Sequence, residues 1–377
     1  MRITGLKTEV YQLRFPRPVY PAWTPGASWS SSEVSVFRVE TDQGLVGIGA
    51  GVGSPAYVRE VVAPRLVGQD PFATERITNI LRDHGGPWLG HTSPWGVELA
   101  LWDLIGKAAS LPVSRMWGRY TDRILGYAST VEIRQPKERA EDALRLLEKG
   151  YRAIKLRLHS PTITEDVAQV RAVRDAVKDR MEILVDANQA ERPGTPRMEE
   201  GPVWDYQRAL TTCRELGALR VAWVEEPLSR YNYEGLTRLA SAVDVPLAGG
   251  ESGCGLHEFR QMIDLNCYTI VQPDAIVSEG LGQLRKVAAY AEMHHKLCVP
   301  HHGGNGFAVA AHLQFSASCP NSPYIELMQD PPAIGVLEIQ GLITEPFDVD
   351  ADGYVQVPDR PGLGVEISDR WRKVASG

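Results

Sequence analysis

Between about residue 124 and residue 340, short apolar segments alternate regularly with longer amphipathic segments. The apolar segments are ILGYAST, RAIKLRLH, EILVDAN, VAWVEEP, VPLAGGES, TIVQPDA, LCVPHH and YIEL. Most are separated by stretches with helical spacing, such as EDVAQVRAVRDAV and LGQLRKVAAYAEMHH. Continuous apolar strands that alternate with helices are typical of a buried parallel sheet. Eight such strands, at a spacing of roughly 25–40 residues, favour a barrel over an open sheet.

The regions on either side of this alternation have other patterns. Before it, EVYQLRF and SEVSVFRVETDQGLVGIGAG favour strands with a hairpin turn at Asp-Gln-Gly, and YVREVVAPRLV, ATERITNILRDH and GVELALWDLIGKAASL favour helices. After it, YVQVPDRPGLGVEIS is rich in Pro and Gly. We therefore predict an α+β domain over residues 1–123, a barrel over residues 124–340, and a C-terminal segment, 341–377, that packs back on the first domain.

Charge and cysteine content limit the classes of partner and compartment. The chain has 40 basic and 47 acidic side chains, a net charge of -7, so neither nucleic acid nor a membrane is expected as a partner. The first residues, MRITGLKTEVYQL, lack the apolar core of a signal peptide, and no apolar run approaches the length of a membrane span. Five cysteines without a CxxC pair favour reduced thiols, so we expect a cytoplasmic protein.

Polar residues follow almost every predicted barrel strand at its carboxyl end. A single such residue would be an ordinary loop residue, but a polar residue after nearly every strand is difficult to explain by structure alone. The carboxyl ends of barrel strands meet at one face, where active sites lie. The residues are Lys155 and Arg157, Asp186 and Asn188, Glu225 and Glu226, Glu251, Asp274, His301 and His302, and Glu326.

Three of these residues, Asp186, Glu225 and Glu251, are carboxylates from consecutive strands. Taken singly, each could cap a helix or pair with an arginine. Together at one end of a barrel they would repel one another unless a cation lay among them. Oxygen ligands that leave room for water and substrate favour Mg²⁺. The sequence therefore predicts that these three residues bind Mg²⁺.

Candidate proton-transfer groups lie on the second and seventh predicted strands. Lys155 and Arg157 are two residues apart and point to the same side, which is expected to lower the pKa of the lysine and suit it to act as a base. Asp274, one strand before His301, is placed to accept a hydrogen bond from its ring. Glu326, at the end of the last strand, could protonate an oxygen of the substrate carboxylate, or donate a hydrogen bond to it, if its surroundings hold it neutral. The alternative is that these are solvated strand ends or core residues.

The order of motifs Lys-x-Arg, Asp-x-Asn, Glu-Glu-Pro, Gly-Gly-Glu, Gln-Pro-Asp, Pro-His and Ile-Glu resembles the mandelate racemase subgroup of the enolase superfamily. ALWDLIGKAASLPVSRMWG resembles the first-domain signature of that family, and PDRPGLGVEI resembles its C-terminal end. The resemblance extends over nearly the whole chain. It implies an α+β capping domain over a (β/α)7β barrel, one Mg²⁺ on the three carboxylates, a lysine base at Lys155, and a dyad of His301 and Asp274 on the opposite face.

Other residues are candidates for binding the substrate. The commoner motif of the subgroup is Lys-x-Lys, whereas Arg157 here is always protonated, so it can bind a carboxylate but is a poor base. Asn188 is a second candidate. The stretch RFPRPVYPAWTPGASW is expected to form a loop over the site, in which Arg17 and Trp23 either touch the distal part of the substrate or pack the domains together. His302 is expected to be structural or to support the residues that contact the substrate.

The expected reaction is the dehydration of a sugar acid, because dehydratases of sugar acids dominate the subgroup that the chain resembles. A base would remove the C2 proton, Mg²⁺ would stabilise the enediolate, and an acid would protonate the leaving C3 hydroxyl, giving a 2-keto-3-deoxy acid. A racemase, epimerase or cycloisomerase shares the first step. A barrel kept only for binding should have lost a ligand or base, and a Schiff-base aldolase would not need the carboxylates. A homo-oligomer is expected.

Overall fold

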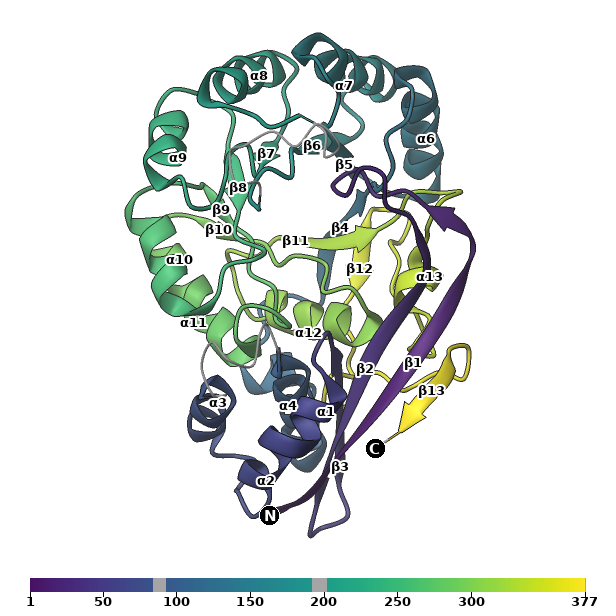
Figure 1. The fold of residues 1–377 in the computed structure, drawn as a ribbon, viewed down its shortest axis with the longest axis vertical. Coiled ribbons are helices and arrows are strands. Elements are labelled where there is room, and N and C mark those ends of the chain that lie inside the picture. The colour runs from purple at the N-terminus through teal and green to yellow at the C-terminus, as the bar shows by residue number, and fades with distance from the viewer. Residues whose placement is uncertain (84–92, 192–201, 377) are drawn as a thin grey trace.

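The computed structural model describes residues 1–83, 93–191 and 202–376, which form an N-terminal α+β domain and a barrel of parallel strands (Figure 1). In the barrel the strands pair in the order β10-β9-β8-β7-β6-β5-β4-β11, all parallel. Between β10 and β11 the Cys298 amide donates to the carbonyl of Asn321 at 2.9 Å. The eight predicted strands are confirmed as β4 (Arg123–Ser129), β5 (Ala153–Arg157), β6 (Glu182–Asp186), β7 (Trp223–Glu225), β8 (Leu247–Gly249), β9 (Ile270–Val271), β10 (Leu297–Cys298) and β11 (Tyr324–Met328).

Helices surround the strands on the outside of the barrel, as expected for a modified (β/α)7β fold (Figure 1). Most of these helices bury an apolar face and expose a polar face. The exception is α12, whose side chains are all buried because the N-terminal domain covers its outer side. The helices are α6 (Pro136–Lys149), α7 (Ile163–Val177), α8 (Tyr206–Ala218), α9 (Tyr233–Ala240), α10 (Gly255–Asp264), α11 (Gly280–Met293), α12 (Gly306–Ser316) and α13 (Val336–Gln340).

The N-terminal domain is an antiparallel sheet with helices on one side. The strands β1 (Ile3–Val19), β2 (Trp29–Thr41) and β3 (Val46–Gly51) are adjacent, and β2 and β3 form the predicted hairpin. A side chain at Gly47 or Gly49 would overlap the backbone of α4 (Trp95–Ala109), so these two glycines let the helix lie directly on the strand. The smaller helical elements are α1 (Pro55–Tyr57), η1 (Val58–Val62), α2 (Ala63–Leu66), α3 (Thr74–Arg82) and α5 (Val113–Met116).

A buried carboxyl group joins the two domains. Glu98 on α4 accepts hydrogen bonds from the amides of Leu281 (2.9 Å) and Gly282 (3.0 Å) at the start of α11 and from Nε1 of Trp102 (2.7 Å). Burial raises the pKa of Glu98 to about 7, although the three donors oppose the shift. This contact fixes the barrel helix α11 against the N-terminal domain.

The C-terminal segment returns across both domains. Its strand β12 (Tyr354–Gln356) pairs antiparallel with the barrel strand β4, and β13 (Arg372–Ser376) pairs antiparallel with β1. Between them, the amide of Leu363 donates to Asp103 of α4 at 3.0 Å. All five cysteines are free thiols. Among the helices that the structure describes, none has the length and apolar character needed to span a bilayer.

Candidate active site

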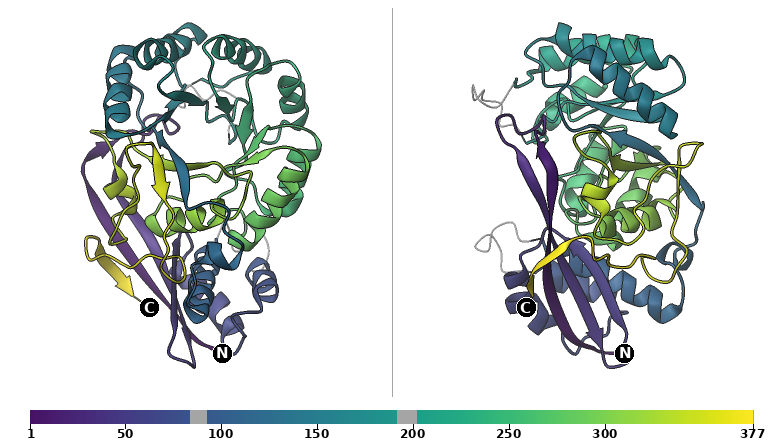
Figure 2. Two further views of the ribbon diagram at one scale, coloured as in Figure 1. Left: turned by 180° about the vertical axis from the view of Figure 1, so that it is seen from behind. Right: turned by 90° about the vertical axis from the view of Figure 1, so that its right-hand side faces the viewer.

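A cavity of about 400 Å³ lies at the carboxyl end of the barrel, between the two domains. Strands β1 and β2 extend from the N-terminal domain along this end of the barrel (Figure 2, right). The N-terminal domain contributes Phe15, Trp23, Trp29, Ser31, Ser32, Glu33 and Val52 to the wall, and the barrel contributes Arg157, Asn188, Glu251, His301, His302, Gly304, Met328 and Ile339. Most of the polar residues that the sequence placed after the barrel strands therefore lie in or beside one cavity.

The ladder of the parallel sheet sets the positions of the first acidic residues. Arg157 is the register partner of Asp186, and Asp186 is the register partner of Glu225, so the three lie side by side across β5, β6 and β7. Asp186 accepts from Arg157 and from both the backbone amide (2.8 Å) and the side-chain amide (2.9 Å) of Asn188. Asn188 has a left-handed backbone (φ 46°), which turns its amide back toward Asp186. In the structure Asn188 therefore orients Asp186.

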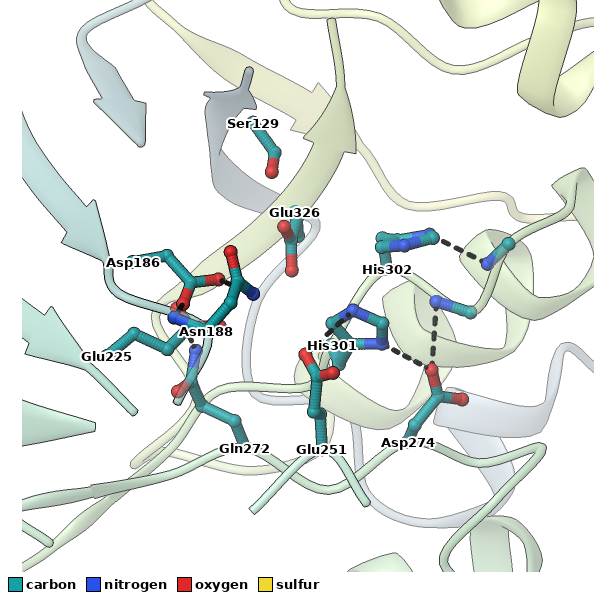
Figure 3. A network of polar contacts seen from close by, with 12 residues as sticks. Ser129, Asp186, Asn188, Glu225, Glu251, Gln272, Asp274, His301, His302 and Glu326 are labelled. Carbon is teal, nitrogen blue, oxygen red and sulfur yellow. Dashed lines mark hydrogen bonds and ion pairs between the residues drawn. The ribbon is translucent and has the colours of Figure 1, made fainter. Parts of the chain in front are cut away.

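Lys155 is fully buried among carboxylates (Figure 3 shows the acidic residues). Its Nζ lies 2.9 and 3.0 Å from the two oxygens of Glu225, 2.8 Å from Glu326 and 3.7 Å from Asp186. Nε2 of Gln272 also donates to Glu225, at 2.9 Å. The lysine thus links strands β5, β7 and β11 at the centre of the barrel mouth.

Two expectations about protonation are wrong in this structure. The pKa of Lys155 is raised, not lowered. Burial and Arg157 both act to lower it, but Glu225 and Glu326 outweigh them and raise the pKa above its usual value. Glu326 could act as a proton donor only if its carboxyl group were neutral, and this condition is not met either. Burial would raise the pKa of Glu326, but Lys155 and then His301 lower it well below the usual range. Both groups are therefore charged.

His301 lies between two acids on the other side of the cavity (Figure 3). Its Nδ1 is 2.8 Å from Asp274, and its Nε2 is 3.1 Å from Glu251. The amide of Gly303 also donates to Asp274, at 3.1 Å. Burial by itself would lower the pKa of His301, but Glu251 and Asp274 raise it to about 10. The ring therefore carries a proton at neutral pH and can donate it.

The predicted metal ligands are engaged with cationic side chains. Each forms an ion pair: Asp186 with Arg157, Glu225 with Lys155, and Glu251 with His301. In this arrangement no three Asp, Glu, His or Cys side chains of the described residues could hold one metal ion together. The chemistry of the donor set nevertheless fits a hard cation, because it consists of oxygens from adjacent strands. The buried Oε1 of Gln272 has no hydrogen-bond partner among the described residues, and water around such a cation could donate to it.

The predicted substrate-binding residues are only partly brought together. Arg157 donates to the carbonyl of Thr130 (2.7 Å) and the hydroxyl of Ser129 (2.9 Å) in addition to Asp186, and its guanidinium lies 4.6 Å from the ring centre of Trp23. Most of its donors are thus used within the protein. Trp23 lines the cavity.

Arg17 is not among the residues that line the cavity. It binds Glu132 at 2.9 Å and the carbonyl of Pro332 at 3.3 Å, so it joins β1 to loops of the barrel. Of the two alternatives for Arg17, the structure favours packing between the domains.

Sequence reasoning missed the residues that support the site. Gln272 lies two positions before Asp274, and strand alternation would have placed both on one side. Ser129 and Thr130 end the first barrel strand, the one strand end left out of the list of polar ends. The serines of β2 gave no signal, because nothing in their spacing shows that this hairpin reaches the barrel.

The family models cover most of the chain. The model described as enolase C-terminal domain-like matches residues 138–371, and that of the mandelate racemase / muconate lactonizing enzyme N-terminal domain matches residues 7–118. The chain belongs to the mandelate racemase subgroup of the enolase superfamily. It is therefore an enzyme of that superfamily, with the capping domain and modified barrel that the sequence resemblance implied.

Similar enolase-superfamily proteins include isomerases and dehydratases. The D-galactarolactone cycloisomerase of Agrobacterium fabrum is 29% identical over 98% of this chain and 97% of that protein. The L-talarate/galactarate dehydratase of Salmonella typhimurium is 29% identical over 99% of this chain and 90% of that protein. A crystal structure of that dehydratase, with Mg and L-lyxarohydroxamate, superposes with a TM-score of 0.85 at 26% identity, covering 100% of this chain and 94% of that chain.

Proposed function

We propose that this enzyme is a Mg²⁺-dependent dehydratase, which removes the proton next to the carboxylate of a sugar acid and eliminates water to give a 2-keto-3-deoxy acid. The observation that carries the proposal is the placement of two cationic proton-transfer groups, Lys155 and His301, on β5 and after β10, with the carboxylates Asp186, Glu225 and Glu251 between them in strand order. The similar dehydratase bound to Mg and a sugar-acid analogue supports the same reading.

Asp186, Glu225 and Glu251 would hold the Mg²⁺. The ion supplies positive charge that stabilises the negative charge developing on a substrate carboxylate when the neighbouring proton leaves. The carboxylates are already crowded: burial, then Glu251 and Asp186, raise the pKa of Glu226 well above its usual range. Such a cluster favours a divalent cation, which neutralises more charge than a single basic side chain does.

Lys155 and His301 divide the two proton transfers. Asp274, which is not among the proposed metal ligands, raises the pKa of His301 through its contact with Nδ1, so His301 is suited to protonate the departing hydroxyl. Lys155 is held protonated by Glu225 in the structure, and neutralising that carboxylate would lower the pKa of Lys155 toward the range of a base. The base takes the C2 proton, and the acid returns a proton to the C3 hydroxyl as water leaves.

The alternative is a racemase, epimerase or cycloisomerase that uses the same two groups. The similarity to a D-galactarolactone cycloisomerase favours this alternative. Dehydration and epimerisation share removal of the C2 proton and differ in the fate of C3. Elimination needs a leaving hydroxyl on C3, whereas epimerisation returns a proton to C2 from the opposite face.

A panel of aldonic and aldaric acids, galactarate among them, should be tested with Mg²⁺ in ²H₂O and followed by proton NMR. Dehydration predicts loss of the C2 signal, a new C3 methylene signal and formation of a 2-keto acid. Exchange at C2 with an unchanged C3 signal would contradict dehydration and identify racemisation or epimerisation.

The variants Lys155→Met and His301→Asn separate the two roles in the same assay. The variant that lacks the base should lose both C2 exchange and turnover. The variant that lacks the acid should keep exchange and lose elimination. Full turnover by both variants would show that the site is wrongly assigned.

A further inference from the structure

His302 follows His301 at the end of β10, and the proposed reaction gives it no role. The two imidazole rings lie 4.2 Å apart between centres, with their planes inclined by 52°. Like His301, His302 lines the active-site cavity. A second histidine beside the proton donor could either compete for protons or contact the substrate, and its hydrogen bonds decide between these possibilities.

The hydrogen bond to Nδ1 determines the protonation state of His302. The backbone amide of Gly304 donates to Nδ1 at 2.8 Å (Figure 3). Nδ1 must then accept, so it carries no proton, and a doubly protonated ring would place one N–H against another. The ring is therefore neutral with its proton on Nε2. Burial and the charge of His301 act in the same direction and lower the pKa of His302 to about 3.

One turn places a backbone donor beside His302 and another beside the acid that pairs with His301. Gly303 (φ 75°) and Gly304 (φ 70°) have left-handed backbones, and their consecutive amides point to different acceptors. The amide of Gly303 donates to Asp274, the acid that keeps His301 charged, and the amide of Gly304 donates to His302. Adjacent imidazoles are thus held in opposite states, one charged and one neutral.

The Nε2–H of His302 is left to face a ligand. Within the described part of the chain, no side chain or backbone atom forms a hydrogen bond with Nε2, although the ring is half-buried in the cavity wall. A neutral imidazole is a very weak acid, so this N–H can donate a hydrogen bond but does not transfer its proton near neutral pH. A hydroxyl or carboxylate oxygen is the acceptor that a sugar acid would offer.

We propose that His302 is a substrate-binding residue that donates its Nε2–H to a substrate oxygen beside the position on which His301 acts. The inference rests on the proposed function for the identity of the substrate class. It makes His302 a determinant of specificity, because a substrate without an oxygen at that position would leave the donor unpaired.

Two substitutions separate the two nitrogens of the ring. His302→Asn keeps an acceptor near the position of Nδ1 and removes the Nε2 donor, whereas His302→Gln can place an amide N–H near the position of Nε2. With galactarate and Mg²⁺, we expect His302→Asn to raise KM about tenfold, the loss of one hydrogen bond, with kcat little changed. His302→Gln should retain most of the affinity. The limbs of the pH–rate profile should not move in either variant, because the group removed does not titrate.

A purely structural role would have another signature. If His302 acted only by positioning His301, His302→Asn would shift the pH–rate profile and lower kcat, and the proposal would be overturned. It would equally be overturned by an unchanged KM in His302→Asn. KM can be measured for elimination or for C2 exchange, so a finding of epimerisation would contradict the proposed function and leave this test intact.

A second measurement does not depend on turnover. In enzyme labelled with ¹⁵N-histidine, His302 should show a protonated Nε2 and an unprotonated Nδ1 from pH 5 to pH 9, and addition of galactarate with Mg²⁺ should shift the Nε2–H signal. A proton on Nδ1, titration within this range, or no shift of the Nε2–H signal on addition of galactarate with Mg²⁺ would each overturn the proposal.

Discussion

Gly303 and Gly304 provide a matched test of the turn that orients both histidines. Both residues have left-handed backbones, so alanine at either position meets similar backbone strain. Their surroundings differ. A Cβ at Gly303 would overlap the Cβ of Ala308 on the buried helix α12 and lie 3.2 Å from Cε1 of His312, whereas the nearest atom to a Cβ at Gly304 is Cε1 of His302, at 3.9 Å.

The two costs can be estimated separately. A non-glycine residue in the left-handed region costs about 1–2 kcal/mol, and both variants should lose stability by this amount. The overlap with Ala308 adds about 1–3 kcal/mol, the usual cost of overpacking a rigid core. Gly303→Ala should therefore be less stable than Gly304→Ala by about 1–3 kcal/mol. Relief of the overlap displaces the amide of Gly303 from Asp274, so Gly303→Ala should also lose more activity than Gly304→Ala.

Urea unfolding and steady-state kinetics of the two variants test this reasoning. A second substitution, Ala308→Gly, removes the overlapping atom and should restore much of the stability lost in Gly303→Ala, although it brings its own small helix penalty. Equal losses in the two single variants, or no recovery in the double variant, would refute the steric argument.

Three further predictions concern charge. Chelation with EDTA should abolish turnover, added Mg²⁺ should restore it, and the thermal midpoint should fall only slightly; full activity without metal would contradict the ligand assignment. Glu98 has a folded-state pKa of about 7 against 4.5 in the unfolded chain, so its stabilising contribution is complete below about pH 4.5 and is lost as the pH rises through 7. Between these limits the wild type should lose up to about 3 kcal/mol more unfolding free energy than Glu98→Gln, which cannot ionise; parallel curves would show that Glu98 does not titrate in this range. Arg157→Met removes the shorter of the two ion pairs of buried Asp186, leaving Lys155 at 3.7 Å, and should cost about 3 kcal/mol, part of which Mg²⁺ should restore, whereas Arg157→Lys should retain measurable turnover. Unchanged stability and activity in Arg157→Met would make Arg157 a bystander.

The sequence predicted the barrel well because its strands are buried on both faces and its outer helices are amphipathic. The segment of α12 has no amphipathic periodicity, since the capping domain covers the side that would otherwise be polar. The sequence pattern also did not predict that β12 and β13 are strands, because both are short and pair with residues far away in the chain. Local pattern shows what a segment can bury, but not which distant segment covers it.

The candidate site was predicted by residue type and strand order, and its electrostatics were not. Strand alternation correctly placed Lys155 and Arg157 on one side, and their proximity suggested a lowered lysine pKa. The opposing carboxylates come from β7 and β11, each two strands away from β5, and their combined effect on the pKa of Lys155 exceeds that of Arg157. Spacing along one strand reveals neighbours on that strand alone, so the sign of such a shift depends on how the strands are arranged in the folded barrel.

The pairing of β13 with β1 also constrains the order of folding. The partner strands come from opposite ends of the described chain, so this edge of the capping sheet closes only after residues 372–376 have been synthesised. Until then β1 has one unpaired edge, and such an edge is prone to pair with other chains. Contacts of such long sequence separation form slowly. Folding yield should therefore depend on how quickly the last strand arrives, and the β1 edge is the site at which a folding intermediate is most exposed to aggregation.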